Sequence, residues 1–157
     1  MSPTAIFVDV VNLYHCIYKK YNNRRLDYQK YLETALKEDM LIKAVAYGTQ
    51  TKDNMNNFIA CLKHIGYITK FAEPIQRGNR KIILNPSVAM ALDIVRISDK
   101  VKNVIIGSTS LEILPIIDWL NEKEISVKVV ACGIPKLIRE NVVQSIEIPE
   151  DLLEAQK

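Results

Sequence analysis

The feature that most constrains this fold is an alternation of short apolar runs with longer segments of helical spacing. The strand-like runs cover residues 4–8, 41–47, 67–72, 104–106, 127–131 and 145–148. The helical segments cover residues 11–21, 26–37, 55–64, 86–98, 111–122 and 135–140. Strands that alternate with helices form βαβ units, which build a mainly parallel sheet with helices on both faces. The sequence therefore predicts an α/β fold, a Rossmann-like three-layer sandwich.

The length of 157 residues fits one domain. We assign residues 1–149 to that domain and residues 150–157 to a C-terminal tail, which we expect to be a frayed terminal helix. Between the strand at 67–72 and the helix at 86–98, the stretch 74–83 contains a run of basic residues. We predict that this stretch is a basic turn between two short extended arms.

Cysteine usage and hydropathy favour a cytoplasmic protein. No apolar run is long enough to span a bilayer, and the N-terminus lacks a basic segment followed by an apolar stretch, so we expect neither a membrane partner nor a secretory signal. The cysteines are odd in number and lie far apart, at Cys16, Cys61 and Cys132. This spacing fits neither a disulfide framework nor a zinc site, and a reducing compartment is the default.

Polar residues follow two of the predicted strands at the places where such sheets bind ligands. Asp9 ends the first strand. Ser108, Thr109 and Ser110 follow the strand at 104–106, and Glu112 comes shortly after them. Ligands of open parallel sheets bind beyond the carboxyl ends of the strands, where the strand order reverses. We therefore expect a functional site there, with the strand at Ile6 next to the strand at Ile105.

Asp93 differs, because it lies inside a helix that is apolar on nearly every side. A charge there needs a partner or a metal. Structural alternatives stay open for each acid: Asp93 can pair with Arg96, and Asp9 can cap the helix that follows it. Glu112 can complete a capping box that starts at Thr109. Asn85-Pro86 fits a helix cap followed by proline at the first helical position.

In order and spacing, four motifs resemble the NYN domains, relatives of the PIN nucleases, over residues 4–148. The motifs are Phe7-Val8-Asp9-Val10-Val11-Asn12-Leu13, Ala91-Leu92-Asp93-Ile94-Val95, residues 104–117 and Ser126-Val127-Lys128-Val129-Val130. The resemblance implies a PIN-like fold and metal-dependent cleavage of RNA. It also shows departures: Ser110 and Ser87 stand where the family commonly has Asp, Glu112 where it has a second Asp, and Val10 replaces a frequent Gly.

The resemblance implies a site for Mg²⁺ or Mn²⁺, hard cations that take oxygen ligands. Its metal ligands would be Asp9, Asp93 and Glu112, which should converge on one pocket. Asn12 would orient the ligand or a water molecule. The polar residues lining the site would be Ser87, Ser108, Thr109 and Ser110. Such a metal activates water and stabilises charge on the attacked phosphate.

RNA is the partner that the resemblance implies, although the formal net charge of +3 does not by itself indicate a nucleic-acid-binding protein. Two basic groups are candidates for gripping phosphates without reading sequence, with a solvated surface as the alternative. They are Arg77, Arg80 and Lys81 in the basic turn, and Lys19, Lys20, Arg24 and Arg25 around the end of the first helix.

Three functions remain open. The first is a metal-dependent ribonuclease, which the acids favour. The second is a catalytically inactive module of the same fold that binds RNA or a protein, which Ser87 and Ser110 favour. The third is a small-molecule α/β enzyme, and the lack of a glycine-rich phosphate loop argues against its nucleotide-binding form. The sequence leaves open whether the chain forms a homodimer.

Overall fold

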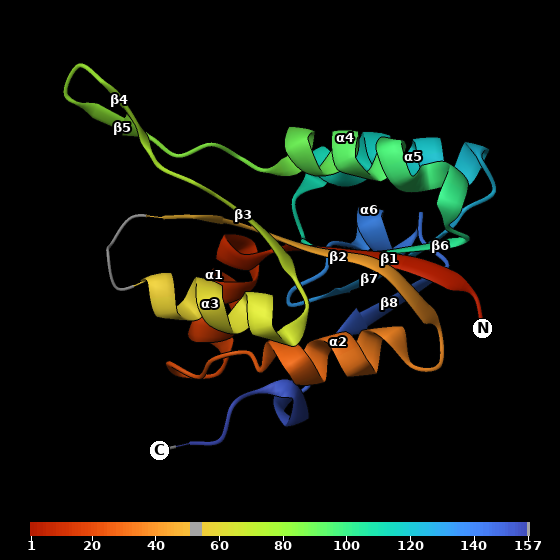
Figure 1. The fold of residues 1–157 in the computed structure, drawn as a ribbon, viewed down its shortest axis with the longest axis horizontal. Helices are drawn as coiled ribbons and strands as arrows, with labels where there is room; N and C mark the ends of the chain where they lie inside the picture. Colours follow the sequence, from red (N-terminus) through yellow and green to blue (C-terminus); the bar gives the residue numbers. More distant parts are fainter. Residues whose placement is uncertain (51–54, 157) are drawn as a thin grey trace.

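A parallel sheet of six strands forms the centre of the computed structural model, which describes residues 1–50 and 55–156 (Figure 1). The strand order is β3-β2-β1-β6-β7-β8, and each neighbouring pair is parallel. The strands are β1 (Pro3–Asp9), β2 (Met40–Thr49), β3 (Ile68–Ala72), β6 (Asn103–Gly107), β7 (Ser126–Ala131) and β8 (Gln144–Glu147). Ile6 pairs with Ile105, which confirms the predicted neighbours.

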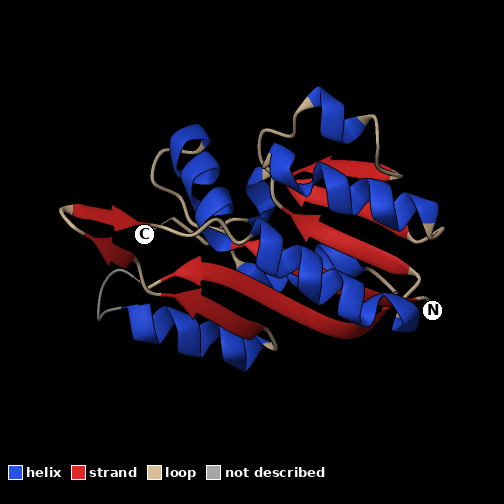
Figure 2. Cartoon of the chain, turned by 90° about the horizontal axis from the view of Figure 1, so that it is seen from above, coloured by secondary structure: helices blue, strands red, loops and turns tan. Residues whose placement is uncertain are grey.

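Helices cover both faces of this sheet, as Figures 1 and 2 show. On one face lie α1 (Val10–Lys20), α2 (Tyr28–Leu36) and α3 (Met55–Ile65). On the other face lie α4 (Ser87–Ile97) and α5 (Leu114–Glu122), and the short α6 (Lys136–Arg139) connects β7 to β8. Short 3₁₀ turns occur at η1 (Ser98–Lys100), η2 (Leu111–Ile113) and η3 (Glu150–Leu152). The predicted three-layer α/β architecture is confirmed. No described helix is both long and apolar enough to cross a membrane.

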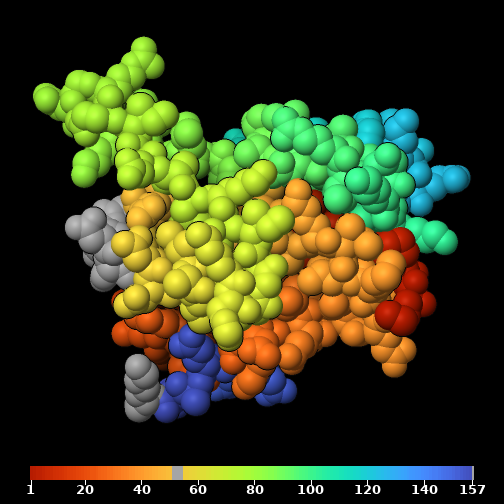
Figure 3. Space-filling view, viewed as in Figure 1, coloured from red at the N-terminus to blue at the C-terminus, as the bar shows by residue number. Residues whose placement is uncertain are grey.

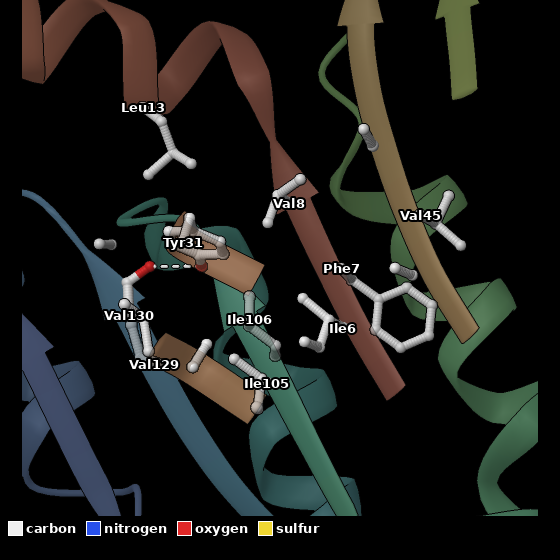
Figure 4. Close-up of a cluster of buried hydrophobic side chains, with 14 of the residues drawn as sticks. Ile6, Phe7, Val8, Leu13, Tyr31, Val45, Ile105, Ile106, Val129 and Val130 are labelled. Carbon is white, nitrogen blue, oxygen red and sulfur yellow. Dashed lines mark hydrogen bonds between the residues drawn. The ribbon is translucent and has the colours of Figure 1, made fainter. Parts of the chain in front are cut away.

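The core is densest around β1, whose residues from Ala5 to Val8 are fully buried. Figure 4 shows the cluster of buried hydrophobic side chains around this strand and the one hydrogen bond drawn within it. The hydroxyl of Tyr31 on α2 donates that bond to the carbonyl of Val130 on β7, at 2.7 Å. Burial of this side chain raises the pKa of Tyr31 well above its ordinary value. The neutral hydroxyl of Tyr31 therefore holds α2 against one face of the sheet.

Gly107 ends β6 beside the side chain of Tyr31 on α2. A Cβ atom at this position would lie 2.6 Å from the Tyr31 hydroxyl oxygen and 2.8 Å from a methyl carbon of Val8. Both distances are too short for nonbonded atoms, so a larger residue would force the core apart. Glycine here therefore lets the polar loop at residues 108–110 begin directly above the core.

The basic stretch forms a small hairpin that projects from the body of the protein (Figures 1 and 3). Its antiparallel strands are β4 (Ile75–Arg77) and β5 (Arg80–Ile82), with Gly78 in the left-handed conformation at the turn. This confirms the prediction of a basic turn between two extended arms. The hairpin leads through residues 83–86 into α4.

The C-terminal segment corrects one expectation, because residues 150–156 do not form a frayed helix. They contain the single turn η3, followed by extended chain, and both Leu152 and Leu153 are buried. Leu153 forms a β-bridge with Leu26, and the backbone N–H of Asp27 donates to the carbonyl of Leu152 at 2.9 Å. Two consecutive leucines therefore hold the segment against the start of α2, which overrides the tendency of chain ends to fray.

Candidate functional site

A cleft of about 320 Å³ lies beyond the carboxyl ends of β1 and β2. It adjoins the point between β1 and β6 where the strand order reverses, which is where such sheets bind ligands. Its lining residues are Asp9, Val11, Asn12, His15, Gly48, Thr49, Ile83, Leu84, Asn85 and Pro86. Among these residues of the described chain, Asp9 is the only carboxylate. The cleft is thus mainly neutral and partly apolar.

Asp9 acts as the N-cap of α1, which confirms the structural alternative for this residue. Its carboxylate accepts a hydrogen bond from the backbone N–H of Asn12 at 3.1 Å, and the side chain is nearly buried. Burial raises the pKa of Asp9, and hydrogen bonds from the backbone of Asn12 and Val11 oppose this effect only in part. Among the described residues, no ion pair joins Asp9 to a cationic side chain.

Asn12 connects the start of α1 to the loop after β6. Its side-chain carbonyl accepts two hydrogen bonds from Thr109, one from the backbone N–H at 3.1 Å and one from the hydroxyl at 3.2 Å. A carbonyl oxygen has two lone pairs, so this oxygen is fully used. Asn12 therefore ties the start of α1 to the loop after β6, whereas its predicted role in orienting a ligand stays a prediction.

The serines of that loop organise the backbone. Ser108 is buried, and its hydroxyl accepts a bond from the N–H of Ser110 at 3.1 Å. The hydroxyl of Ser110 in turn accepts from the N–H of Glu112 at 3.2 Å, so Ser110 caps the 3₁₀ turn η2. The expected capping box from Thr109 to Glu112 is therefore wrong: Ser110 is the cap, and Glu112 contributes its backbone N–H. The Glu112 residue is exposed.

Ser87 and Asn85 form the start of α4 together. The side-chain carbonyl of Asn85 accepts a hydrogen bond from the N–H of Ser87 at 2.9 Å, so Asn85 caps the first turn, although α4 begins one residue later than expected, with Pro86 in the N-cap position. Ser87 itself is buried at the first turn of the helix. Because Asn85 also lines the cleft, the start of α4 forms one wall of the site.

Asp93 on α4 is nearly buried and has donors on both carboxylate oxygens. Oδ2 accepts from the hydroxyl of Tyr47 at 2.6 Å and from the ammonium of Lys70 at 2.7 Å. Oδ1 accepts from Arg96 at 3.3 Å, so the predicted pairing with Arg96 is present as the longest of the three contacts. Burial alone would raise the pKa of Asp93, but the hydrogen bonds from Lys70 and Tyr47 and the positive charges of Lys70 and Lys43 together hold it below its ordinary value.

Tyr47 and Lys70 are the site residues that sequence reasoning missed. Tyr47 on β2 is in register with Asp9 on β1 and with Lys70 on β3. Residues in register on neighbouring parallel strands project to the same face of a sheet. Asp9, Tyr47 and Lys70 thus stand in a row across three strands, on the face that α4 covers. The only signal in the sequence was that Asp93, inside an apolar helix, needed some partner.

The expected convergence of Asp9, Asp93 and Glu112 on one pocket is not observed. Asp9 lines the cleft, Asp93 is neutralised by cations, and Glu112 is exposed. Among the residues that the structure describes, no group of three or more His, Cys, Asp or Glu side chains is placed to hold a metal ion. The described residues thus offer no three-acid cluster for Mg²⁺ or Mn²⁺, and metal binding at this site stays a prediction.

The basic residues of the hairpin are exposed and close in sequence to the cleft. Arg77 and Arg80 are directly opposite each other in the register of the two strands, and Lys81 is next to Arg80 in the sequence. The residues that follow the hairpin, from Ile83 to Pro86, line the cleft. The hairpin therefore extends one wall of the cleft as a positively charged arm.

The residues of the second basic group have different roles; the group consists of Lys19, Lys20, Arg24 and Arg25. Arg24 has a largely buried side chain that pairs with Glu150 at 3.1 Å and donates to the carbonyl of Glu154 at 2.8 Å. Arg24 therefore fixes the C-terminal segment. Lys19, Lys20 and Arg25 are exposed; Lys19 and Lys20 form the last turn of α1, and Arg25 lies beyond its end. At about 1.5 Å per residue, Lys19 and Lys20 lie about 14–15 Å along the helix axis from the start of α1.

The fold and the polar cleft at its carboxyl edge define an α/β domain of the PIN-like type. The chain belongs to the NYN domain family, which matches residues 3–147. No protein of curated function matches the chain.

One similar solved structure is a protein of unknown function, VPA0982, from Vibrio parahaemolyticus RIMD 2210633. It aligns with a TM-score of 0.88 at 22% identity over 98% of this chain and 96% of that chain, which supports the fold. UDP-GlcNAc 2-epimerase from Neisseria meningitidis aligns with a TM-score of 0.41 at 10% identity, over 89% of this chain and 34% of that chain. That likeness is too weak to carry an argument.

Proposed function

We propose that this NYN domain binds single-stranded RNA in the cleft and along the hairpin, without metal-dependent cleavage. The observation that carries the proposal is the charge of the site: Asp9 alone contributes a carboxylate to the cleft lining among the described residues, and Asp93 is already paired with Lys70. A phosphate can approach such a surface without a cation to screen a cluster of acids. This function is a specific form of the second of the three that the sequence left open, the catalytically inactive module that binds RNA or a protein.

The hairpin supplies the positive charge that phosphates need. Like charges directly opposite each other destabilise a pair of strands, so the Arg77–Arg80 pair weakens the hairpin when nothing is bound. A phosphate between the two guanidinium groups would relieve this repulsion through charge-assisted hydrogen bonds. The Arg77–Arg80 pair is therefore unfavourable in the free protein and becomes favourable when an anion binds between the two side chains.

The cleft supplies surfaces for a base. Val11, Ile83 and Leu84 are apolar lining residues, while Thr49 and Asn85 offer hydrogen-bonding groups. In single strands the bases are free to leave the stack and enter such a site, whereas in duplexes they are not. This combination favours single-stranded RNA over a double-stranded partner.

The test is the salt dependence of binding to a labelled single-stranded RNA, measured by fluorescence anisotropy. Replacing Arg77, Arg80 and Lys81 with alanine should weaken binding and reduce the slope of log affinity against log salt by about 2, since each lost phosphate contact contributes about 0.7. A variant with Lys19, Lys20 and Arg25 replaced by alanine loses the same formal charge at the far end of α1 and serves as the control. Equal losses in both variants, or an unchanged slope in the hairpin variant, would contradict the proposal.

A metal-dependent ribonuclease is the second candidate, and the position of Asp9 in the cleft favours it. Mg²⁺ is often held by one or two carboxylates together with substrate phosphates, so a single acid is a minimal ligand set. Cleavage of single-stranded RNA should be measured with Mg²⁺, with Mn²⁺ and with a chelator. We expect no metal-dependent cleavage by the native chain. Cleavage that Asp9→Asn abolishes and Ser110→Asp increases would establish the ribonuclease instead.

A further inference from the structure

We propose that the ammonium group of Lys70 is a built-in cation that replaces a divalent metal at Asp93. The carboxylate of Asp93 on α4 is nearly buried against the sheet, where an unmatched negative charge would be strongly unfavourable. Lys70 lies 2.7 Å from Oδ2 and supplies the matching charge from β3. This inference deepens the proposed function and rests on it in one respect, because it explains how RNA binding proceeds without metal.

Strand register positions Lys70 for this role. Lys70 is in register with Tyr47, and both donate to the same oxygen of Asp93. Tyr47 is in turn in register with Asp9, the acid of the cleft. The ammonium is therefore held by the order of three adjacent strands and by a neutral hydroxyl beside it. Burial and the neighbouring carboxylate raise the pKa of Tyr47, so that hydroxyl stays protonated.

A metal ion would have to compete directly with these donors. Oδ2 already accepts two hydrogen bonds and Oδ1 accepts one from Arg96. A divalent cation approaching Oδ2 would displace the ammonium or lie beside it, and the two positive charges would repel each other strongly at low effective dielectric. The arrangement therefore both satisfies Asp93 and excludes a metal ion.

The experiment is a titration of the full chain with Mn²⁺, followed by electron paramagnetic resonance and by isothermal calorimetry. The native chain should show no saturable site in the concentration range where Lys70→Met does, because methionine keeps the stem of the side chain and removes the charge. We expect Mn²⁺ binding to tighten by about tenfold or more in Lys70→Met, because the bound metal loses a repelling neighbour. Lys70→Gln provides a second, polar variant in case the methionine variant does not fold.

Two matched variants locate the effect. Lys43→Met removes a positive charge that also influences Asp93 but makes no hydrogen bond to it, so it should gain little metal affinity. The double variant Lys70→Met with Asp93→Asn should lose the metal affinity that Lys70→Met gained. An ordinary structural salt bridge would change stability in Lys70→Met without creating a Mn²⁺ site, so the absence of that site overturns the proposal.

The outcomes separate this inference from the proposed function. Saturable Mn²⁺ binding by the native chain at Asp93 would overturn the role of Lys70, even if RNA binding in chelator persisted. An equal gain in Lys43→Met would also overturn it, because net charge rather than occupancy would then control the site. Failure of the native chain to bind RNA, with the metal results as expected, would reject the proposed function and leave the role of Lys70 standing.

Discussion

The cleft around Asp9 and the ion-pair cluster around Asp93 use the same side chain in opposite electrostatic settings. The two residues are almost equally buried, with exposed fractions of 6% and 5%. Asp9 has backbone N–H groups as donors, and its pKa is raised. Asp93 has Lys70, Tyr47 and Arg96 as donors, and its pKa is lowered. Equal burial therefore does not determine the ionisation of a carboxyl group.

The two carboxylates differ in the charge of their hydrogen-bond donors. Backbone N–H groups supply hydrogen bonds but no net charge, so they offset only part of the desolvation of Asp9. An ammonium group supplies both, and it outweighs the desolvation of Asp93. One acid thus remains responsive to a ligand in the cleft, while the other is fixed as part of the structure.

The largest expected effect comes from Asp93→Asn. This change removes the charge that neutralises Lys70 and leaves the ammonium without its partner, although Lys70 can still turn toward solvent. We expect the free energy of unfolding to fall by about 2 kcal/mol at neutral pH, below the full loss for a completely buried pair. Urea denaturation followed by circular dichroism measures this change. Stability equal to that of the native chain would mean that the ion pair contributes nothing net.

Acid should reduce the deficit of this variant. The folded-state pKa of Asp93 lies below its ordinary value of 3.8, so its stabilising contribution is present above 3.8 and is lost as the pH falls through the lower folded value. The difference in unfolding free energy between the native chain and Asp93→Asn should therefore shrink as the pH is lowered from 5 toward 3. A difference independent of pH would place the effect in packing rather than in charge.

Asn12→Ala should have a smaller effect. The change leaves the backbone N–H and hydroxyl of Thr109 without their shared acceptor. An unsatisfied donor at a partly buried site lowers the unfolding free energy by about 1–2 kcal/mol. Asn12→Asp keeps an acceptor at the same position and serves as the control for the hydrogen bonds alone. Faster amide exchange of Thr109 in the alanine variant, absent in the control, would show that the loop has been released.

The smallest effect, with the opposite sign, is expected for Asp9→Asn. Asparagine also caps helices well, so the bond to the N–H of Asn12 is kept while the buried charge is removed. Because the folded pKa of Asp9 is raised, its charged form lowers stability fully above that raised value and not at all below 3.8. The variant should be more stable by up to about 1 kcal/mol at pH 7, with the gain fading in acid. A loss of stability at pH 7 would break the contrast between the two acids.

The architecture could be predicted because its signals are local. Apolar runs such as residues 104–106 and helical spacing in α2 reflect burial of nearby positions along the chain. The hairpin could be predicted from the turn residues around Gly78. The exception was the C-terminal segment, where burial of Leu152 and Leu153 depends on the start of α2, more than 120 positions earlier in the sequence.

The site was less predictable because its partners are distant in sequence. Asp93, Asp9 and Asn85 were recognised as residues with particular local roles, and the caps of Asp9 and Asn85 are confirmed. The pairing of Asp93 with Lys70 depends on strand order and register, which no short pattern encodes. A metal cluster and an internal ion pair also leave the same trace in a sequence, namely an acid in an apolar helix.

The projecting hairpin also divides the chain into two contiguous half-sheets. Strands β3, β2 and β1 precede it in sequence, and β6, β7 and β8 follow it. Contacts between the halves include the Tyr31–Val130 hydrogen bond and the Lys70–Asp93 ion pair. A chain opened at Gly78 would yield two fragments that each retain three adjacent strands. We expect such fragments to reassemble when co-expressed, which would make this domain a scaffold for split-reporter assays.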